Sequence, residues 1–169
     1  VHVTLTAPAH PGPSLHTGER ALLTLRPAPP GTGIVFRRVD LPDEPTVAAC
    51  IAHVKTVERA TTLAERSVKV QTVEPVLSAL AGLGVDNAFI EMDANEPPIG
   101  DGSALPYVEL VRQCGLAPQD APRAVFDVRE PLHVETKSGA LLTIVPADRF
   151  RVSVTQVGPD GLATQFHSA

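Results

Sequence analysis

The chain has 169 residues, enough for one ordinary domain or two small ones. Hydrophobic residues make up 43% of the chain and aromatic residues 4%, which excludes a disordered chain and predicts a core of aliphatic side chains. The formal net charge is −5 and no basic face stands out, so we expect no nucleic-acid partner.

The cysteines and the hydropathy bear on the cellular compartment. Cys50 and Cys114 are too few for a disulfide framework, which favours a reducing compartment. No apolar run approaches the roughly 20 residues of a membrane span, and no signal peptide opens the chain. We therefore expect a cytoplasmic protein.

Because the chain starts at Val1 without an initiator Met and stops directly after a strand-like segment, we interpret it as a fragment. A processed or renumbered complete protein is the alternative.

Strand-like segments dominate the first third of the chain. Runs of β-branched and apolar residues predict strands over 21–25, 33–39, 46–51, 60–63 and 68–71. The Pro-rich segment 26–32 separates the first two strands in the manner of a hairpin connection. Residues 65–67 mark a turn that pairs the last two strands.

A helical spacing of apolar residues begins after Thr72. Apolar side chains then recur at every third or fourth position, at Val73, Val76, Leu77, Leu80 and Leu83. Thr72 is suited to cap this helix, and Gly82 or Gly84 to end it. Pro75 falls in the first turn, where its missing N–H is not needed.

A second strand-and-helix pair follows. The sequence predicts a strand over 88–92, an acidic Pro- and Gly-rich loop over 93–103, and a helix over 105–114 that ends at Gly115. The turn at 100–103 is either an anion-binding turn or, as the pattern favours, a tight turn whose Ser103 caps the helix.

The pattern predicts an α+β fold. A sheet covered on one face by two helices accounts for residues 1–118. Residues 117–123, which include two prolines, read as a linker, and strands are expected again over 124–128, 132–135, 140–146 and 150–155. We therefore predict one domain over 1–118 and the incomplete start of a second, similar domain over 119–169.

Taken alone, the residues do not identify an activity. The six histidines form no HxxxH or HExxH motif, and the chain has no GxSxG, P-loop or GxGxxG pattern. Glu74 at a helix start is explained by the helix dipole. Without a resemblance, the interpretation ends at a soluble α+β protein.

Four blocks in order resemble one family, the zinc amidase LpxC (UDP-3-O-acyl-N-acetylglucosamine deacetylase) of lipid A biosynthesis. They comprise Ser14–Pro42, Ala60–Leu63, the Thr72–Asn87 segment with its Thr-Val-Glu start, and Glu96–Ala104. The resemblance extends over about residues 12–155 and implies two similar domains, each a sheet with two helices. The details look closest to the branch in which the deacetylase is fused to a dehydratase.

The resemblance also implies a chemistry, metal-assisted amide hydrolysis with a glutamate as general base. That glutamate falls on Glu74. The histidine ligand that follows it in the family falls on Pro75, which cannot bind zinc, and the other zinc ligands lie beyond Ala169. We therefore expect no zinc on this chain and no activity of this chain alone.

The substrate implied is a UDP-linked acyl-glucosamine. Its expected contacts in this chain are Leu15, His16, Glu58, Arg59 and Ala60. Glu58 and Arg59 depart from the family, which is often more apolar at these two positions. The missing C-terminal half or a second copy of the chain is the expected partner.

Two alternatives stay open. Pro75 and the absence of all three zinc ligands also fit a non-catalytic relative that serves as a binding or interaction module. A family-like fold with an unrelated function is the third possibility, since a fold does not fix a function.

Overall fold

The fold is that of a computed structural model, which describes residues 1–7, 10–158 and 164–169. The chain forms two compact units, Val1–Arg123 and Ala124–Ala169, and each is described by itself. Among the described residues, no helix is both long and apolar enough to cross a membrane.

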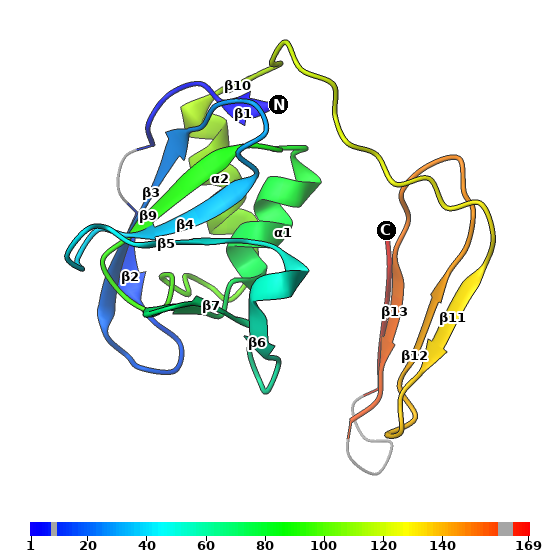
Figure 1. Cartoon of the computed structure of the whole chain (residues 1–169). Coiled ribbons are helices and arrows are strands. Elements are labelled where there is room, and N and C mark those ends of the chain that lie inside the picture. Colours follow the sequence, from blue (N-terminus) through cyan, green and yellow to red (C-terminus); the bar gives the residue numbers. More distant parts are fainter. Residues whose placement is uncertain (8–9, 159–163) are drawn as a thin grey trace. The chain divides into compact units, whose positions relative to one another are not determined.

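A five-stranded mixed sheet forms the frame of the first unit (Figure 1). In spatial order its strands are β2 (His10–Pro13), β3 (Arg20–Pro27), β9 (Ala88–Met92), β4 (Ile34–Arg38) and β5 (Thr46–Ala48). The strands predicted over 21–25, 33–39 and 88–92 are confirmed. The hairpin predicted between the first two is wrong, because β9 lies between them, antiparallel to β3 and parallel to β4.

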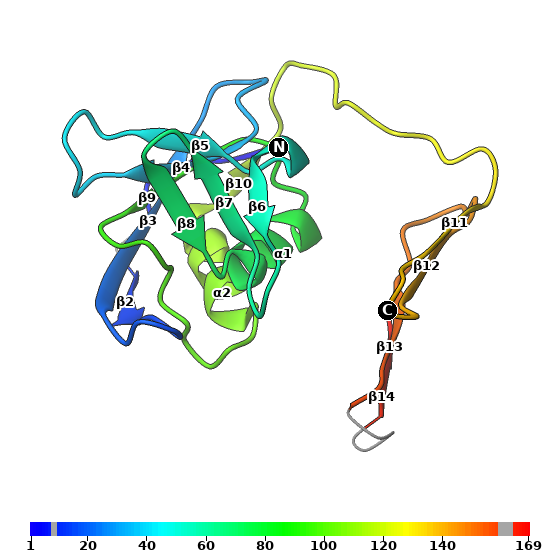
Figure 2. The ribbon, with the colours of Figure 1, turned by 60° about the horizontal axis from the view of Figure 1, so that its bottom comes forward.

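The segment after β5 builds a second, smaller sheet. The strand predicted over 46–51 ends early, because the chain turns into a short 3₁₀ helix, η1 (Ile51–His53). The sheet that follows contains three antiparallel strands, β6 (Val54–Thr56), β7 (Thr62–Glu65) and β8 (Val68–Gln71). The predicted pairing of 60–63 with 68–71 is confirmed in β7 and β8, which lie side by side in Figure 2.

Two helices follow the strands, α1 (Glu74–Gly82) and α2 (Leu105–Cys114). The structure gives α2 the predicted bounds and ends it at Gly115, whose φ of +68° suits glycine. The cap predicted for α1 is wrong. Its N-cap residue is Val73, without a side-chain cap, because the Thr72 hydroxyl bonds elsewhere.

Both helices cover the same face of the large sheet. Along β3 and β9 the side chains alternate, so Leu23, Leu25 and Ile90 are fully buried on the helix side. They share one core with residues of both helices, including Leu80 and Val111. The predicted α+β fold, a sheet covered on one face by two helices, is thereby confirmed.

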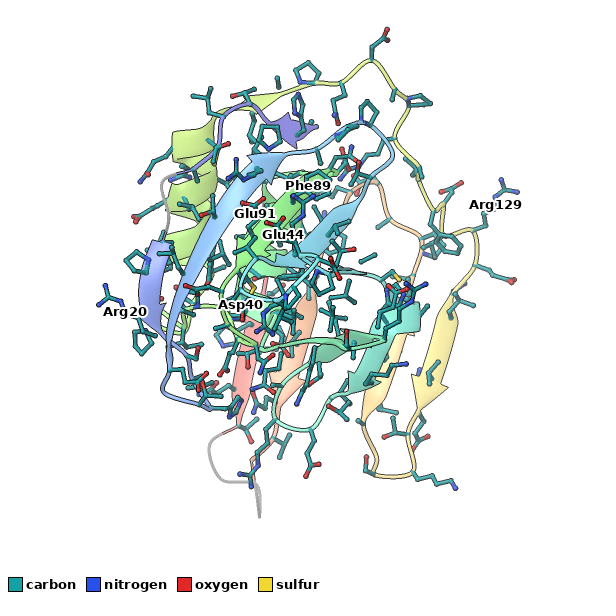
Figure 3. All side chains as sticks on the ribbon, turned by 60° about the vertical axis from the view of Figure 1, so that its left-hand side comes forward. Arg20, Asp40, Glu44, Phe89, Glu91 and Arg129 are labelled. Atoms are coloured by element: carbon teal, nitrogen blue, oxygen red, sulfur yellow. The ribbon has the colours of Figure 1, made fainter. Side chains whose placement is uncertain are left out.

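The opposite face of the sheet is charged, and none of the described helices of this unit covers it. Glu91 pairs with Arg26 and, at 3.3 Å between Oε1 and Nη1, with Arg37. The Arg37 guanidinium also lies 4.6 Å from the ring centre of Phe89. Phe89 and Glu91 lie on this face of β9 (Figure 3).

The ends of the first unit meet in a short ladder. β1 (His2–Val3) pairs antiparallel with β10 (Leu116–Ala117). The predicted linker over 117–123 therefore begins one residue inside a strand, and the first compact unit extends to Arg123.

The described residues of the second unit form two antiparallel strand pairs. β11 (Leu132–Glu135) pairs with β12 (Leu141–Ile144), and β13 (Ser153–Gln156) with β14 (Gln165–Ser168). The strand predicted over 132–135 is confirmed with the same bounds, and those over 140–146 and 150–155 are confirmed with shifted ends, whereas the strand predicted over 124–128 is wrong. Leu132, Val134, Leu142 and Ile144 share one face of their hairpin and each is at least 42% exposed.

Candidate functional site

Glu74 is the first residue of α1, and its side chain is exposed. Its Oε1 accepts a hydrogen bond of 2.5 Å from the backbone N–H of Thr61. The helix N-terminus favours a negative charge at this position. The carboxylate is therefore open to solvent and held against the loop that precedes β7.

That loop contains the three predicted substrate contacts Glu58, Arg59 and Ala60. Glu58 and Arg59 are exposed and Ala60 is half-buried, and Arg59 has a φ of +58°. Because Thr61 follows directly, the bond from its N–H to Glu74 brings this group next to the start of α1.

Thr72, two residues before Glu74, has an unusual backbone conformation. Its φ is +56°, a region that β-branched residues rarely adopt. Its hydroxyl donates a hydrogen bond of 2.5 Å to Oε1 of Glu96. Both side chains are buried, at 7% and 1% exposed.

Glu96 connects this position to the turn that contains the other predicted contacts. Its Oε2 accepts hydrogen bonds from the backbone N–H groups of His16, at 3.0 Å, and Thr17, at 3.4 Å. The Ser14 hydroxyl donates to the Glu96 carbonyl oxygen at 3.1 Å. Within this turn, Leu15 is 54% exposed and His16 is exposed as well.

The structure therefore links all the predicted site residues through hydrogen bonds and short stretches of chain. Glu74 contacts the loop of Glu58–Ala60 directly, through Thr61. Leu15 and His16 are connected to Glu74 through Glu96 and Thr72. The sequence did not indicate a role for Glu96, whose one signal was its position in a block that resembles the family. For Thr72 the sequence predicted a capping role.

The loop that contains Glu96 is fixed on both sides. The Asn95 carbonyl oxygen accepts from the Gln71 N–H at 2.9 Å, and its side chain accepts from Arg38. The Tyr107 hydroxyl donates to the Pro98 carbonyl oxygen. Burial raises the pKa of Tyr107, so this hydroxyl stays protonated and remains a donor.

The turn at 100–103 leads into α2 and is held by side-chain hydrogen bonds of Asp101 and Ser103. The Ser103 hydroxyl accepts from the Leu105 N–H at 3.1 Å, at the start of α2. Asp101 Oδ1 accepts from the Ser103 hydroxyl at 2.7 Å and from its N–H at 2.9 Å, and these bonds lower the pKa of Asp101. The tight turn predicted from the sequence is confirmed, but the cap predicted at Ser103 is wrong, because the N-cap residue of α2 is Ala104, without a side-chain cap.

The donors at this site do not suit a zinc ion. Pro75, beside Glu74, has no ligating atom in its side chain, and its carbonyl oxygen accepts a hydrogen bond from the Ser78 hydroxyl at 3.0 Å. Across residues 1–7, 10–158 and 164–169, no three side chains of His, Cys, Asp or Glu are grouped so as to hold a metal.

Comparison with known proteins identifies the family. The family model described as "UDP-3-O-acyl N-acetylglycosamine deacetylase", LpxC, matches residues 4–168. The chain belongs to the LpxC family. The match includes both compact units, and so extends beyond the helix-covered sheet into the hairpins.

Two LpxC relatives are longer than this chain. The UDP-3-O-acyl-N-acetylglucosamine deacetylase of Pseudomonas entomophila (strain L48) is 48% identical over 142 residues, which are 84% of this chain and 46% of that protein. The protein of the same name from Legionella pneumophila (strain Corby) is 45% identical over 144 residues, 85% of this chain and 47% of that protein. The chain thus spans about half the length of these curated relatives.

Proposed function

We propose that this chain is the N-terminal part of an LpxC deacetylase that acts on UDP-3-O-acyl-N-acetylglucosamine in lipid A biosynthesis. The observation that carries the proposal is the arrangement around Glu74. An exposed carboxylate at a helix N-terminus lies against one predicted substrate loop and is connected to the other through buried hydrogen bonds. The names of the relatives supply the substrate class.

In the proposed reaction Glu74 is the general base. Water attacks the acetyl carbonyl carbon, the C–N bond breaks, and acetate and an amine form. Glu74 Oε1 is occupied by the Thr61 N–H, so we assign Oε2 to accept the proton of the attacking water. Leu15, His16, Glu58, Arg59 and Ala60 are proposed to contact the substrate.

Zinc is expected in the family, but the residues described in this chain do not fit it. No step of the mechanism is therefore assigned to a metal on this chain. The groups placed here supply a base and substrate contacts, and nothing that protonates the leaving amine. We propose that the chain alone is inactive and that the remaining catalytic groups belong to a C-terminal half.

The second compact unit supports the proposal that further chain follows the first domain. We propose residues 1–118 as the first domain and 119–169 as the start of a similar second domain. The exposed apolar side chains of the β11–β12 hairpin would be covered by the rest of that domain or by a second copy. A cytoplasmic location is part of the same proposal.

Pro75 favours one other candidate function, a non-catalytic LpxC-like binding or interaction module. The proline occupies the position of the expected histidine ligand, and α1 forms around it without disruption. A relative that has lost catalysis can keep such a helix.

Zinc content and deacetylation distinguish these functions. Both would be measured on the 169-residue chain, on a version extended through the rest of the parent reading frame, and on Pro75→His forms of each. An extended protein that holds about one zinc and deacetylates the nucleotide sugar supports the enzyme. Zinc binding by the Pro75→His extension alone supports an inactivated member. Absence of zinc from both extensions would contradict the catalytic proposal.

A further inference from the structure

We propose that Glu96 is a positioning residue that fixes His16 and Glu74 relative to each other. The inference rests on the proposed function of those two residues. Glu96 itself is 1% exposed, so it is not expected to contact the substrate. Its role is exerted through the hydrogen bonds of its two carboxylate oxygens.

The two oxygens serve two different segments. Oε2 accepts from the backbone N–H groups of His16 and Thr17, and Oε1 accepts from the Thr72 hydroxyl. A buried carboxylate is costly unless it is hydrogen-bonded, and these three donors meet that requirement. The Glu96 carboxylate therefore sets the spacing between two segments. One is the turn closed by the bond from the Gly18 N–H to the Ser14 carbonyl oxygen, called the 14–18 turn, and the other is Thr72, which precedes α1.

The backbone of Thr72 supports a specific role for Oε1. A threonine at φ +56° is strained, and such a conformation persists where its surroundings enforce it. A threonine hydroxyl at this position could instead cap the N-terminus of α1. Here it donates to Glu96. This bond directs the entry of α1, and Glu74 is its first residue.

Glu96 is also a fixed point in its own loop. Asn95 is held by Gln71 and Arg38, and the Ile99 N–H donates to the Pro13 carbonyl oxygen at 2.9 Å. Because the loop is anchored on both sides of Glu96, a change at the carboxylate is transmitted to the 14–18 turn and to α1, and less to the loop itself.

Hydrogen exchange on the 169-residue chain tests the coupling. Glu96→Leu removes both acceptor oxygens and keeps a side chain of similar size. Glu96→Gln retains an oxygen for the N–H groups and an amide group for the Thr72 hydroxyl. Glu91→Leu is the matched control on the opposite face of the sheet. We expect Glu96→Leu to accelerate exchange of the His16, Thr17 and Thr61 amides about tenfold or more. The Gln variant should largely restore protection, and the control should leave all three amides unchanged.

Thr61 is the decisive amide, because it bonds to Glu74 and not to Glu96. If Glu96→Leu exposes His16 and Thr17 but leaves Thr61 protected, Glu96 holds the turn alone and the proposal is wrong. An equal effect of Glu91→Leu would also overturn it, because the cause would then be general destabilisation. Should Glu96→Leu fail to fold, Thr72→Val and Thr72→Ser provide the same comparison, with Thr61 accelerated in the valine variant alone.

An activity measurement separates this inference from the proposed function. In the extended parent, Glu96→Leu should lower kcat/KM about tenfold or more and Glu96→Gln should largely restore it. If the parent with Glu96 intact shows no deacetylation, the proposed function fails, while the exchange data still decide whether Glu96 couples the two segments.

Discussion

Glu74 and Thr61 are joined by a hydrogen bond of 2.5 Å between the carboxylate of one and the backbone N–H of the other. The bond connects the first residue of a helix to a loop whose residues are otherwise largely exposed. A proposed catalytic base thus has a structural contact of its own, which can be measured without any substrate.

The first prediction concerns that contact. Glu74→Ala removes the acceptor and should accelerate hydrogen exchange of the Thr61 amide, whereas Glu74→Gln, which keeps an oxygen, should preserve its protection. Loss of the acidic residue at the helix start should lower the free energy of unfolding by less than about 1 kcal/mol. Unchanged protection of Thr61 in the alanine variant would show that the bond does not form in solution.

The second prediction concerns pH and the pair Arg38–Asp40. Arg38 Nε donates to Asp40 Oδ1 at 2.7 Å and Nη2 to Oδ2 at 2.5 Å. These hydrogen bonds hold the pKa of Asp40 below its ordinary value of 3.8, against an opposing effect of burial. Because the folded-state pKa is the lower one, the ionised carboxylate contributes stability that is fully present above pH 3.8 and is lost as the pH falls through the folded-state pKa.

Asp40→Asn should therefore lower the free energy of unfolding at neutral pH. The difference between the two proteins should shrink as the pH is lowered below 3.8. Urea unfolding of both proteins across this range measures it, and the other carboxylates, shared by both, cancel in the comparison. A difference that stays constant with pH would rule out the pair as its source.

The third prediction compares two glycines at helix ends. Gly115 has a φ of +68°, and an added Cβ would meet Thr4 Oγ1 at 2.7 Å. Gly115→Ala should lower the free energy of unfolding by about 1–2 kcal/mol. An added Cβ at Gly82, the last residue of α1, meets no heavy atom within 4 Å, so Gly82→Ala should raise it by about 0.5–1 kcal/mol. Thermal or urea unfolding gives both values, and changes of the same sign would contradict this account.

The fourth prediction concerns the core beneath the sheet. Ile90 is fully buried at the centre of β9, whereas Ile51 in η1 is 91% exposed. Ile90→Ala should lower the free energy of unfolding by about 2–5 kcal/mol, because it removes packed methyl groups and leaves a cavity. Ile51→Ala should change it by less than about 0.5 kcal/mol. Similar effects of the two variants would mean that the helices do not pack on this face.

Local patterns in the sequence were sufficient to predict most elements of the first unit. Runs of β-branched and apolar residues predicted β3 and β9, and an apolar face followed by Gly115 predicted α2. The pairing of β9 with both β3 and β4 was not predictable in this way, since such a run indicates a strand and does not identify the neighbouring strand.

The candidate site shows the same limit more sharply. Thr72 is of a residue type that often caps helices, but its hydroxyl donates to Glu96, which is distant in the sequence. Glu74 and His16 entered through the resemblance alone, because neither belongs to a motif that is specific by itself. What the sequence could not show is the hydrogen bonding that connects them.

The position of β9 at the centre of the sheet also determines when the protein can fold during synthesis. Until Met92 has been made, the strands of this sheet have only the partners of two separate ladders, β2 with β3 and β4 with β5. A nascent chain released earlier exposes unpaired edges on β3 and β4. Cooperative folding of this unit on the ribosome therefore awaits β9 and then α2, which closes the core.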